Sequence, residues 1–402
     1  MSLIQIFIAL ILLFHSTPHQ EQIDKAMKDQ NRSSSTGITF FLCGDVMTGR
    51  GIDQILPNSV NPVIYESYVK DARLYVRLAE TQNGPLRQPV SYSYIWGDAI
   101  KVWEQLKPAH KIINLETSIT THNKPWPGKG INYRMHPRNV EVLTSVGIDF
   151  CSLANNHILD WEYEGLLETL QVLKDAGIAY AGAGINLDEA SKYVQLKSGQ
   201  SDVIIFAFGS PASGVPENWA ATAESPGVNL LHIPDDEALI RISGQVKSVK
   251  KSGQIVIFSI HWGNNWGYEI LDRQRYVAHW LIDNASVDII HGHSSHHPQG
   301  IEIYKDKLIL YGAGDFINDY EGISGYESYR DDLTLMYFPT IEPSNGRLIS
   351  MIMVPMQIRN LRLNHASLPD TKWLLKMLNR EGKKLGTSVS LNENRYFSLH
   401  WD

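Results

Sequence analysis

Short apolar runs alternate with segments of helical spacing along most of the chain. Seven runs of five to seven residues, bounded by turn residues, predict buried β-strands. They are Ile38–Gly44, Lys111–Leu115, Phe150–Ala154, Val203–Gly209, Ile255–His261, Val287–His291 and Lys307–Gly312. Because helical segments separate these strands, the pattern predicts an α/β fold with helices packed against sheet.

Two of the intervening segments show the helical spacing most clearly. In Glu164–Ala176, leucines recur on one face until Gly177 ends the run. In Asp272–Ala285, the apolar and aromatic residues also gather on one face. We therefore expect two amphipathic helices at these positions.

The ends of the chain and one internal segment depart from this alternation. Residues 1–16 contain an apolar run shorter than the roughly 20 residues that span a bilayer, which favours a secretory signal peptide. The alternatives are an uncleaved membrane anchor or a buried helix. Residues 17–36 are polar, as in a flexible lead-in. The main domain is expected over 37–365, with an insertion at 56–98, and a C-terminal helical extension is expected over 366–402.

Composition limits the classes of function. The chain has 402 residues, of which 43% are hydrophobic and 20% are charged, so it is long enough for one large domain or two ordinary ones. Its net charge of −7 leaves no basic footprint for nucleic acid. Cys43 and Cys151, the only cysteines, lie in apolar runs and are assigned no chemistry. Export to the cell envelope or beyond it is expected from the N-terminal run.

A dense group of histidines follows one of the predicted strands. Four histidines fall within the seven residues from His291 to His297. Neutral imidazole nitrogens bind Zn, Mn or Fe, and a strand end fixes their direction. The group therefore predicts a transition-metal site. The alternative is a polar loop whose histidines contact only water.

Other metal-type side chains follow four further predicted strands. In α/β sheets, ligands bind where the carboxyl ends of the strands meet. A single Asp or Asn at such a position is more often a helix cap or a turn residue. Five strand ends with oxygen or imidazole donors together predict a site for one or two divalent transition-metal ions. Two ions about 3.5–4 Å apart would share one carboxylate, for which Glu116 is the candidate.

The order of these motifs resembles the CapA family of poly-γ-glutamate capsule biosynthesis proteins, also called PgsA. The domain of that family is similar to calcineurin-like metallophosphoesterases. The resemblance covers roughly residues 37 to 340 and rests on Gly44–Arg50, Asn114–Thr117, Ala154–Asp160, Gly182–Gly184, His261–Gly263, Gly292–His293 with His296, and Tyr311–Phe316. It implies a four-layer α/β/β/α sandwich.

Carried over residue by residue, the resemblance implies six metal ligands shared between two ions. The first ion would be held by Asp45, Glu116 and His296, and the second by Glu116, Asn156, His261 and His293. Met47 stands where many metallophosphoesterases have a histidine, and Glu116 stands where an Asp is usual. The first ion thus loses a nitrogen ligand, and its site is expected to be weak, empty or filled by a different metal.

The histidine group also departs from the family pattern. The usual Gly-His-His-Pro-His reads Gly292-His293-Ser294-Ser295-His296 here, which keeps the two outer imidazoles. His291 and His297 are left without a ligand role, either behind the ligands or facing solvent.

The resemblance also implies residues that act on a substrate. His157 would donate a proton to a leaving group, with Asp160 holding its ring, and the alternative is a histidine that caps the following helix. Arg50, Lys129 and Arg134 are the candidate cations for an anionic substrate, because such groups bind carboxylate or phosphate. Taken singly, each of the three is more often a surface charge.

Three functions remain as hypotheses. The first is a cell-envelope protein of poly-γ-glutamate capsule biosynthesis, which cleaves or transfers an amide or ester with a metal-activated water. The second is a metallophosphoesterase, and the third is a non-catalytic polymer-binding or export component. Six metal-type residues beside His157 favour an enzyme, whereas Met47 disfavours ordinary two-metal phosphoesterase chemistry. Expected partners are an anionic polymer or a phosphate or amide substrate, membrane proteins of capsule synthesis, and the membrane itself through the N-terminus.

Overall fold

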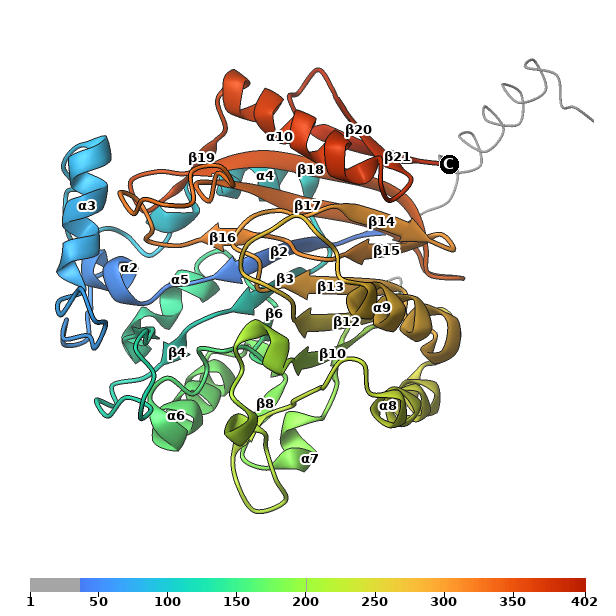
Figure 1. Cartoon of the computed structure of the whole chain (residues 1–402), viewed down its shortest axis with the longest axis horizontal. Coiled ribbons are helices and arrows are strands. Elements are labelled where there is room, and N and C mark those ends of the chain that lie inside the picture. Colours follow the sequence, from blue (N-terminus) through green and yellow to red (C-terminus); the bar gives the residue numbers. More distant parts are fainter. Residues whose placement is uncertain (1–36, 200) are drawn as a thin grey trace, which may run out of the picture. The chain divides into compact units, whose positions relative to one another are not determined.

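Two extended β-sheets form the centre of the part of the chain that the computed structural model describes, residues 37–199 and 201–402 (Figure 1). The large sheet has the strand order β20 (Thr387–Leu391), β21 (Phe397–Trp401), β18 (Arg347–Ile358), β17 (Leu333–Glu342), β2 (Phe41–Val46), β3 (Lys111–Leu115), β6 (Phe150–Ser152) and β7 (Ala179–Ala181). Three short strands join it at the side: β1 (Ile38–Thr39) pairs with β17, β16 (Asp315–Ile317) with β2, and β19 (Leu363–His365) with β18.

The second sheet holds the strands that carry the histidines. Its order is β14 (Ile301–Tyr304), β15 (Lys307–Leu310), β13 (Ile289–His293), β12 (Ile255–His261), β10 (Val203–Gly209) and β9 (Val194–Leu196). The strands β10, β12, β13 and β15 run parallel. Two small ribbons pair β8 (Ala183–Gly184) with β11 (Gly227–Val228) and β4 (Ser118–Ile119) with β5 (Arg134–Met135).

Alternating side chains divide the interior into separate cores. Leu42 of β2 points toward the second sheet and packs in one core with Ile257 and Ile289, whereas Phe41 and Cys43 point the other way. This is the period of two that a strand imposes on its side chains. The two sheets therefore lie face to face over a shared apolar layer.

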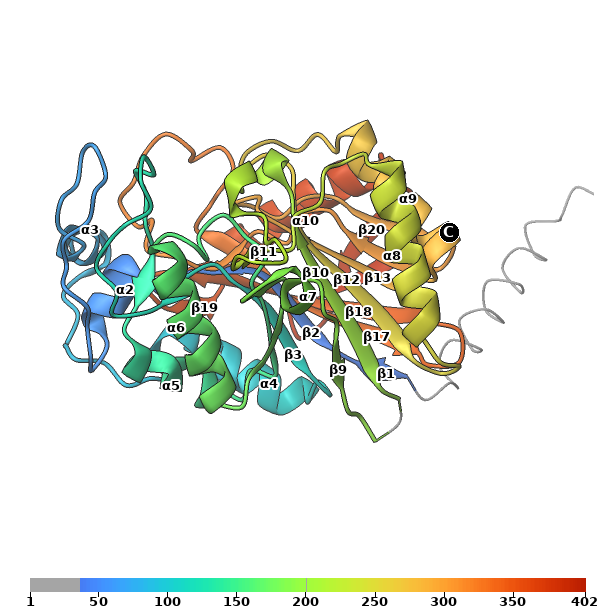
Figure 2. The same ribbon diagram turned by 90° about the horizontal axis from the view of Figure 1, so that it is seen from below.

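Helices cover both outer faces of the sheet pair (Figures 1 and 2). On the large sheet lie α4 (Ala99–Leu106), α5 (Glu141–Thr144) and α6 (Glu162–Asp175), with α2 (Arg50–Ile55) and α3 (Arg73–Asn83) at the edge of the same core. On the second sheet lie α8 (Asp236–Val249) and α9 (Asp272–Ala285). The short α7 (Leu187–Ala190) packs on β8. The fold is thus the predicted four-layer α/β/β/α sandwich.

Most predicted strands and helices agree with the structure to within two residues at each end, although the strand predicted at Ile38–Gly44 is divided between β1 and β2. The strand expected at Val287–His291 runs from Ile289 to His293, because pairing with β12 continues through both histidines. The segment 366–402 is not wholly helical: after α10 (Leu368–Gly382) it ends in β20 and β21, whose buried residues alternate with exposed ones. Figure 1 shows α10 beside these two strands. Pairing of β21 with β18, and of β20 with β21, makes these strands part of the large sheet.

The N-terminal predictions lie outside the described residues. These are the signal peptide or anchor at 1–16 and the lead-in at 17–36. Within residues 37–199 and 201–402, the structure contains no helix of the length and hydropathy needed to cross a membrane.

Candidate metal centre

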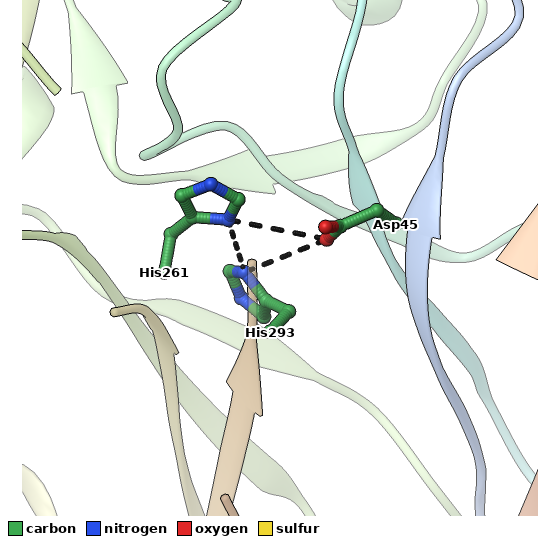
Figure 3. Close-up of side chains that lie close together, drawn as sticks. All are labelled: Asp45, His261 and His293. Carbon is green, nitrogen blue, oxygen red and sulfur yellow. Dashed lines mark hydrogen bonds and ion pairs between the residues drawn. The ribbon is translucent and has the colours of Figure 1, made fainter. Parts of the chain in front are cut away.

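The ends of β12 and β13 bring two histidines of the second sheet together. Parallel pairing sets His261 opposite His293, so both rings lie on the same face. Their Nδ1 atoms are 2.9 Å apart, and each lies 3.9 Å from Oδ1 of Asp45, which reaches across from β2. Figure 3 shows these three side chains pointing toward one another. Three buried metal-type donors thus meet between the two sheets.

These donors have the spacing of ligands around one ion. Zn-like ions bind nitrogen and oxygen at about 2.0–2.2 Å, which places neighbouring ligand atoms about 3–4 Å apart. The other nitrogen of His261, Nε2, lies 3.1 Å from Oδ1 of Asn156 and 3.8 Å from Oε1 of Glu116. Because Nδ1 and Nε2 of one imidazole point in different directions, Asn156 and Glu116 lie beside a different nitrogen of His261 from the one that faces His293, and the four ligands predicted for the second ion do not meet at one point. The chemistry of Asp45, His261 and His293 fits a divalent transition metal.

A second group of donors adjoins the first. Oδ1 of Asp315 lies 3.0 Å from Nδ1 of His296, and β16 pairs with β2 so that Asp315 stands opposite Asp45. Donor atoms of Asp45, His296 and Asp315 all lie within 4.8 Å of one another. Asn318 donates its amide to the other oxygen of Asp315 at 2.8 Å, which fixes the carboxylate.

Asp315 was not among the predicted ligands. It lies shortly after the predicted strand Lys307–Gly312, and it belongs to the Tyr311–Phe316 motif that carried the resemblance. The reasoning that polar residues at strand ends are ligands applies to it as well, so this signal was available in the sequence.

The carboxylate common to both groups is Asp45, whereas the sequence analysis expected Glu116. Asp45 lies within β2 between β3 and β16, and its short side chain faces the histidines of the other sheet. Glu116 follows the end of β3, and its Oε1 is 3.8 Å from His261 and 3.9 Å from His157. Glu116 therefore stands between the histidine pair and His157.

Burial sets the electrostatics of these donors. It raises the pKa of Asp45 to about 8, with the charge of Asp315 adding to the effect. Burial, followed by the charge of Asp45, raises the pKa of Glu116 well above its ordinary value. It lowers the pKa of His261 and of His293. Metal ions bind ionised carboxylates and neutral imidazoles. A divalent cation would therefore favour the ionised form of these crowded carboxylates and the neutral form of the imidazoles.

Hydrogen bonds hold the shared carboxylate in place. Asn114 donates its amide to Oδ1 of Asp45 at 2.7 Å, and the backbone N–H of Ser294 donates to Oδ2 at 3.2 Å. Gly44 lets β16 approach, because a Cβ there would lie 1.7 Å from the carbonyl oxygen of Gly314. The lack of a side chain at this position allows Asp315 to reach Asp45.

His157 lies beside the metal-type donors with its ring held by Asp160. Its Nδ1 is 2.7 Å from Oδ2 of Asp160, while its Nε2 faces Glu116 at 3.9 Å. Tyr133 stacks on the ring with centroids 4.0 Å apart. Burial lowers the pKa of His157 to about 4, so its ring is neutral at pH 7. The alternative of a helix cap does not hold, since α6 begins after Trp161 without a side-chain cap.

A pocket of about 340 Å³ opens over these residues. It is lined by Glu116, Lys129, Gly130, Ile131, Tyr133, Asn156, His157, His261, Asn265, Ser294, His296 and Tyr320. Lys129, one of the three candidate cations, lies in its wall, with Nζ 2.8 Å from Asp160 and 3.3 Å from His157. A substrate in this pocket would contact both His157 and the metal-type donors.

The other two candidate cations lie outside this lining. The guanidinium of Arg50 pairs with Asp319 and, at 2.8 Å, with Glu66, and it lies 3.6 Å from the ring of Tyr75. Because buried partners already satisfy it, Arg50 is not placed to bind substrate.

Arg134 is likewise used within the protein. Its guanidinium donates to the backbone carbonyls of His122 and Asn61 and lies 3.7 Å from the ring of Trp161. Lys129 alone of the three predicted cations faces the pocket.

The structure is thus an α/β/β/α sandwich with two adjacent groups of metal-type donors. The family model described as "Bacterial capsule synthesis protein PGA_cap" matches residues 39–320, more than half of the chain. The chain belongs to this family, which confirms the predicted resemblance.

Named relatives extend the match. A probable polyglutamine synthesis accessory protein of Mycobacterium tuberculosis (strain ATCC 25618 / H37Rv) is 45% identical over 354 residues, covering 88% of this chain and 93% of the relative. The PGA biosynthesis protein CapA of Bacillus subtilis (strain 168) is 27% identical over 294 residues, covering 73% and 66%. A solved novel phosphatase of Mycoplasma pneumoniae is similar at a TM-score of 0.43 and 11% identity, covering 84% and 97%, a likeness too remote to inform function.

Proposed function

We propose that this protein is a metal-dependent hydrolase or transferase of the cell envelope that acts on an amide or ester bond during poly-γ-glutamate capsule synthesis. The observation that carries the proposal is the meeting of Asp45, His261 and His293 across two sheets, beside a pocket that contains His157. The family supports the capsule context, since relatives are named for PGA or polyglutamine synthesis.

The donors divide into two sets that would each hold an ion of the Mn, Zn or Fe type. Asp45, His261 and His293, with Asn156 and Glu116 nearby, form one set, and Asp45, His296 and Asp315 form the other. A bound divalent ion would act as a Lewis acid on the substrate and lower the pKa of a water molecule. Because the donor side chains are buried, bulk water is kept away from them, and charge interactions among them are stronger than they would be in water.

His157 would move a proton at the pocket wall. If the neutral His157 ring donates its Nδ1 proton to Asp160, its Nε2 carries a lone pair. That Nε2 lies near Glu116, which lines the pocket. Nε2 is thus placed to accept a proton and then pass it to a leaving group. Lys129 contacts the same Asp160, and its ammonium gives the pocket a positive charge for an anionic substrate.

A phosphoesterase is the second candidate, and Asp315 is the observation that favours it. The chain has Met47 where a histidine ligand was expected, which argued against a two-ion centre. Asp315 brings a carboxylate within 4.8 Å of Asp45 and His296, so this set regains a third donor. Two adjacent ions suit in-line displacement at phosphorus.

One set of assays separates these functions. The purified protein is stripped with a chelator, reloaded with Mn²⁺ or Zn²⁺, and incubated with poly-γ-glutamate and with p-nitrophenyl phosphates. We expect metal-dependent change in polymer length, abolished in His157→Ala. Turnover of the phosphates alone would establish the phosphoesterase instead. Polymer binding without turnover of either substrate would leave the third hypothesis, a binding or export component.

A further inference from the structure

His291, which has no ligand role, lies between the two sheets directly behind the metal centre. Parallel pairing of β12 and β13 sets Ser259 opposite His291 and His261 opposite His293. Because side chains alternate along a strand, all four share the face that looks toward the large sheet. Ser259 and His291 are both 0% exposed. Ser259 and His291 are thus a buried polar pair, and each lies two residues before a histidine donor on the same strand.

A continuous line of hydrogen bonds joins this pair to the centre. Nε2 of His291 lies 2.7 Å from the carbonyl oxygen of Cys43 in β2. Oγ of Ser259 lies 3.2 Å from Nδ1 of His291 and 3.0 Å from Nε2 of His293. Nδ1 of His293 then faces Nδ1 of His261 and Oδ1 of Asp45. The line runs from the backbone of the large sheet to a metal-facing nitrogen.

With neutral rings, one arrangement of protons satisfies every contact in this line. A carbonyl oxygen only accepts, so Nε2 of His291 carries the proton and its Nδ1 is an acceptor. Ser259 has one hydroxyl proton and donates it to that Nδ1. Its oxygen must then accept from Nε2 of His293, which leaves a lone pair on Nδ1 of His293. That lone pair points at Asp45 and His261.

We infer that Ser259 and His291 are positioning residues that lock His293 in the tautomer whose Nδ1 is free to bind a metal ion. A hydrogen bond to one ring nitrogen decides which nitrogen is available to a metal. The inference rests on the proposed function only in taking the bound group to be a metal. The tautomer itself is a property of the metal-free protein.

The tautomer can be read directly from nitrogen chemical shifts. In metal-free protein labelled with ¹⁵N-histidine, two-bond proton–nitrogen correlation spectra distinguish a protonated ring nitrogen from a bare one. The His293 signals are assigned by their absence in His293→Asn. We expect a protonated Nε2 and a bare Nδ1 in the wild-type protein, and a mixture in Ser259→Ala. A wild-type His293 protonated at Nδ1 would overturn the inference.

Metal affinity gives a second readout. Competition with a chromogenic chelator should show that Ser259→Ala weakens Zn²⁺ binding by about 10–100-fold, as is typical when a residue that orients a ligand is lost. His291→Gln can still donate to Cys43 and accept from Ser259, so it should bind more tightly than His291→Leu. Wild-type affinity in both Ser259→Ala and His291→Leu would contradict the inference.

Two controls separate this inference from the proposed function. Thermal melts of the metal-free variants show whether lost affinity reflects lost folding. A wild-type protein that binds no Zn²⁺ or Mn²⁺ at all would refute the proposed metal centre, whereas the tautomer spectra would still decide the role of Ser259. The two failures are therefore distinguishable.

Discussion

His157 and His261 both face Glu116, yet their hydrogen bonds give them different roles. His261 lies 2.9 Å from a second imidazole and near Asp45, as an ion ligand requires. His157 is held by Asp160 at 2.7 Å, and its other nitrogen faces the pocket side. At the scale of single residues, the proposed function therefore assigns the ion to His261 and the substrate to His157.

Substitution should separate the two roles. His157→Ala should keep its bound metal and lose about 10²–10⁴-fold in turnover, the usual contribution of a proton-transferring group. His261→Ala, the matched variant, should lose both metal and turnover. Elemental analysis of each purified protein, run beside the activity assay, tests this. Metal loss in His157→Ala would show that its role is assigned wrongly.

Asp315→Asn tests whether the second donor set binds an ion. The substitution keeps the size of the side chain and its contact with Asn318 but removes the charge that faces His296. We expect the metal content at saturation to fall from two equivalents to one. Isothermal titration with Mn²⁺ measures the number of sites. Two sites in the variant would mean that Asp315 only pairs with His296.

The candidate ligands at strand ends could be predicted from the sequence, whereas the residues behind them could not. Asp45, His261 and His293 were identified because polar groups that end apolar runs stand out. Ser259 lies inside an apolar strand, and its place beneath His293 follows only from the register of β12 with β13. Arg50 was assigned to substrate because the sequence does not show which carboxylates will surround it.

At the scale of elements, Arg50 connects the segment 56–98, which was predicted to be an insertion, to the loop after β16. Its guanidinium binds Glu66 of the insertion and Asp319, which follows that strand. The next residue, Tyr320, lines the pocket, and its hydroxyl lies 3.0 Å from that of Tyr133. The insertion therefore supports one wall of the pocket.

Arg50→Met should be strongly destabilising, because it leaves two buried carboxylates without their cation. A cost of about 3–5 kcal/mol is typical for breaking a buried ion pair on one side. Urea unfolding at pH 7 measures it. Arg77→Met, at an exposed position on α3, is the control and should change stability by less than about 0.5 kcal/mol. Equal midpoints for the two variants would contradict this account.

Elements were predicted correctly where a continuous apolar run or a helical spacing marked them. Val203–Gly209, Ile255–His261 and Asp272–Ala285 were predicted with the bounds that the structure shows. Prediction failed over 366–402, because the alternation in β20 and β21 is short and amphipathic next to a strongly helical segment. Pairing of β21 with β18 is a long-range contact that local patterns do not reveal, and β20 joins the sheet through β21.

At the scale of the whole molecule, the centre couples stability to pH. The pKa of Asp45 is raised from 3.8 to about 8, mainly by burial. Between these values the folded metal-free protein keeps a proton that the unfolded chain has released, so Asp45 lowers the free energy of unfolding as pH rises. Bound metal reverses the trend, because it requires the ionised carboxylate and releases the proton.

Asp45→Asn isolates this effect, since the variant cannot ionise at that position. In metal-free protein, the unfolding free energy of the variant relative to the wild type should increase from pH 5 to pH 8. Urea titrations with a chelator present measure this difference in unfolding free energy. The buried histidines are common to both proteins, so their contribution to the difference largely cancels. When Mn²⁺ is added, the free energy of unfolding of the wild type should increase most at pH 8. A difference independent of pH would refute the raised pKa.

The donors of the centre are dispersed from residue 45 to residue 315 and come from both sheets. No contiguous stretch of the polypeptide carries a complete set, so a nascent or truncated chain that stops before residue 293 lacks at least one donor of each set. Because each set draws donors from both sheets, an ion of the proposed kind could bind only after the two sheets have packed together. If the centre binds metal as proposed, tightly held metal would report that an individual molecule has completed its folding.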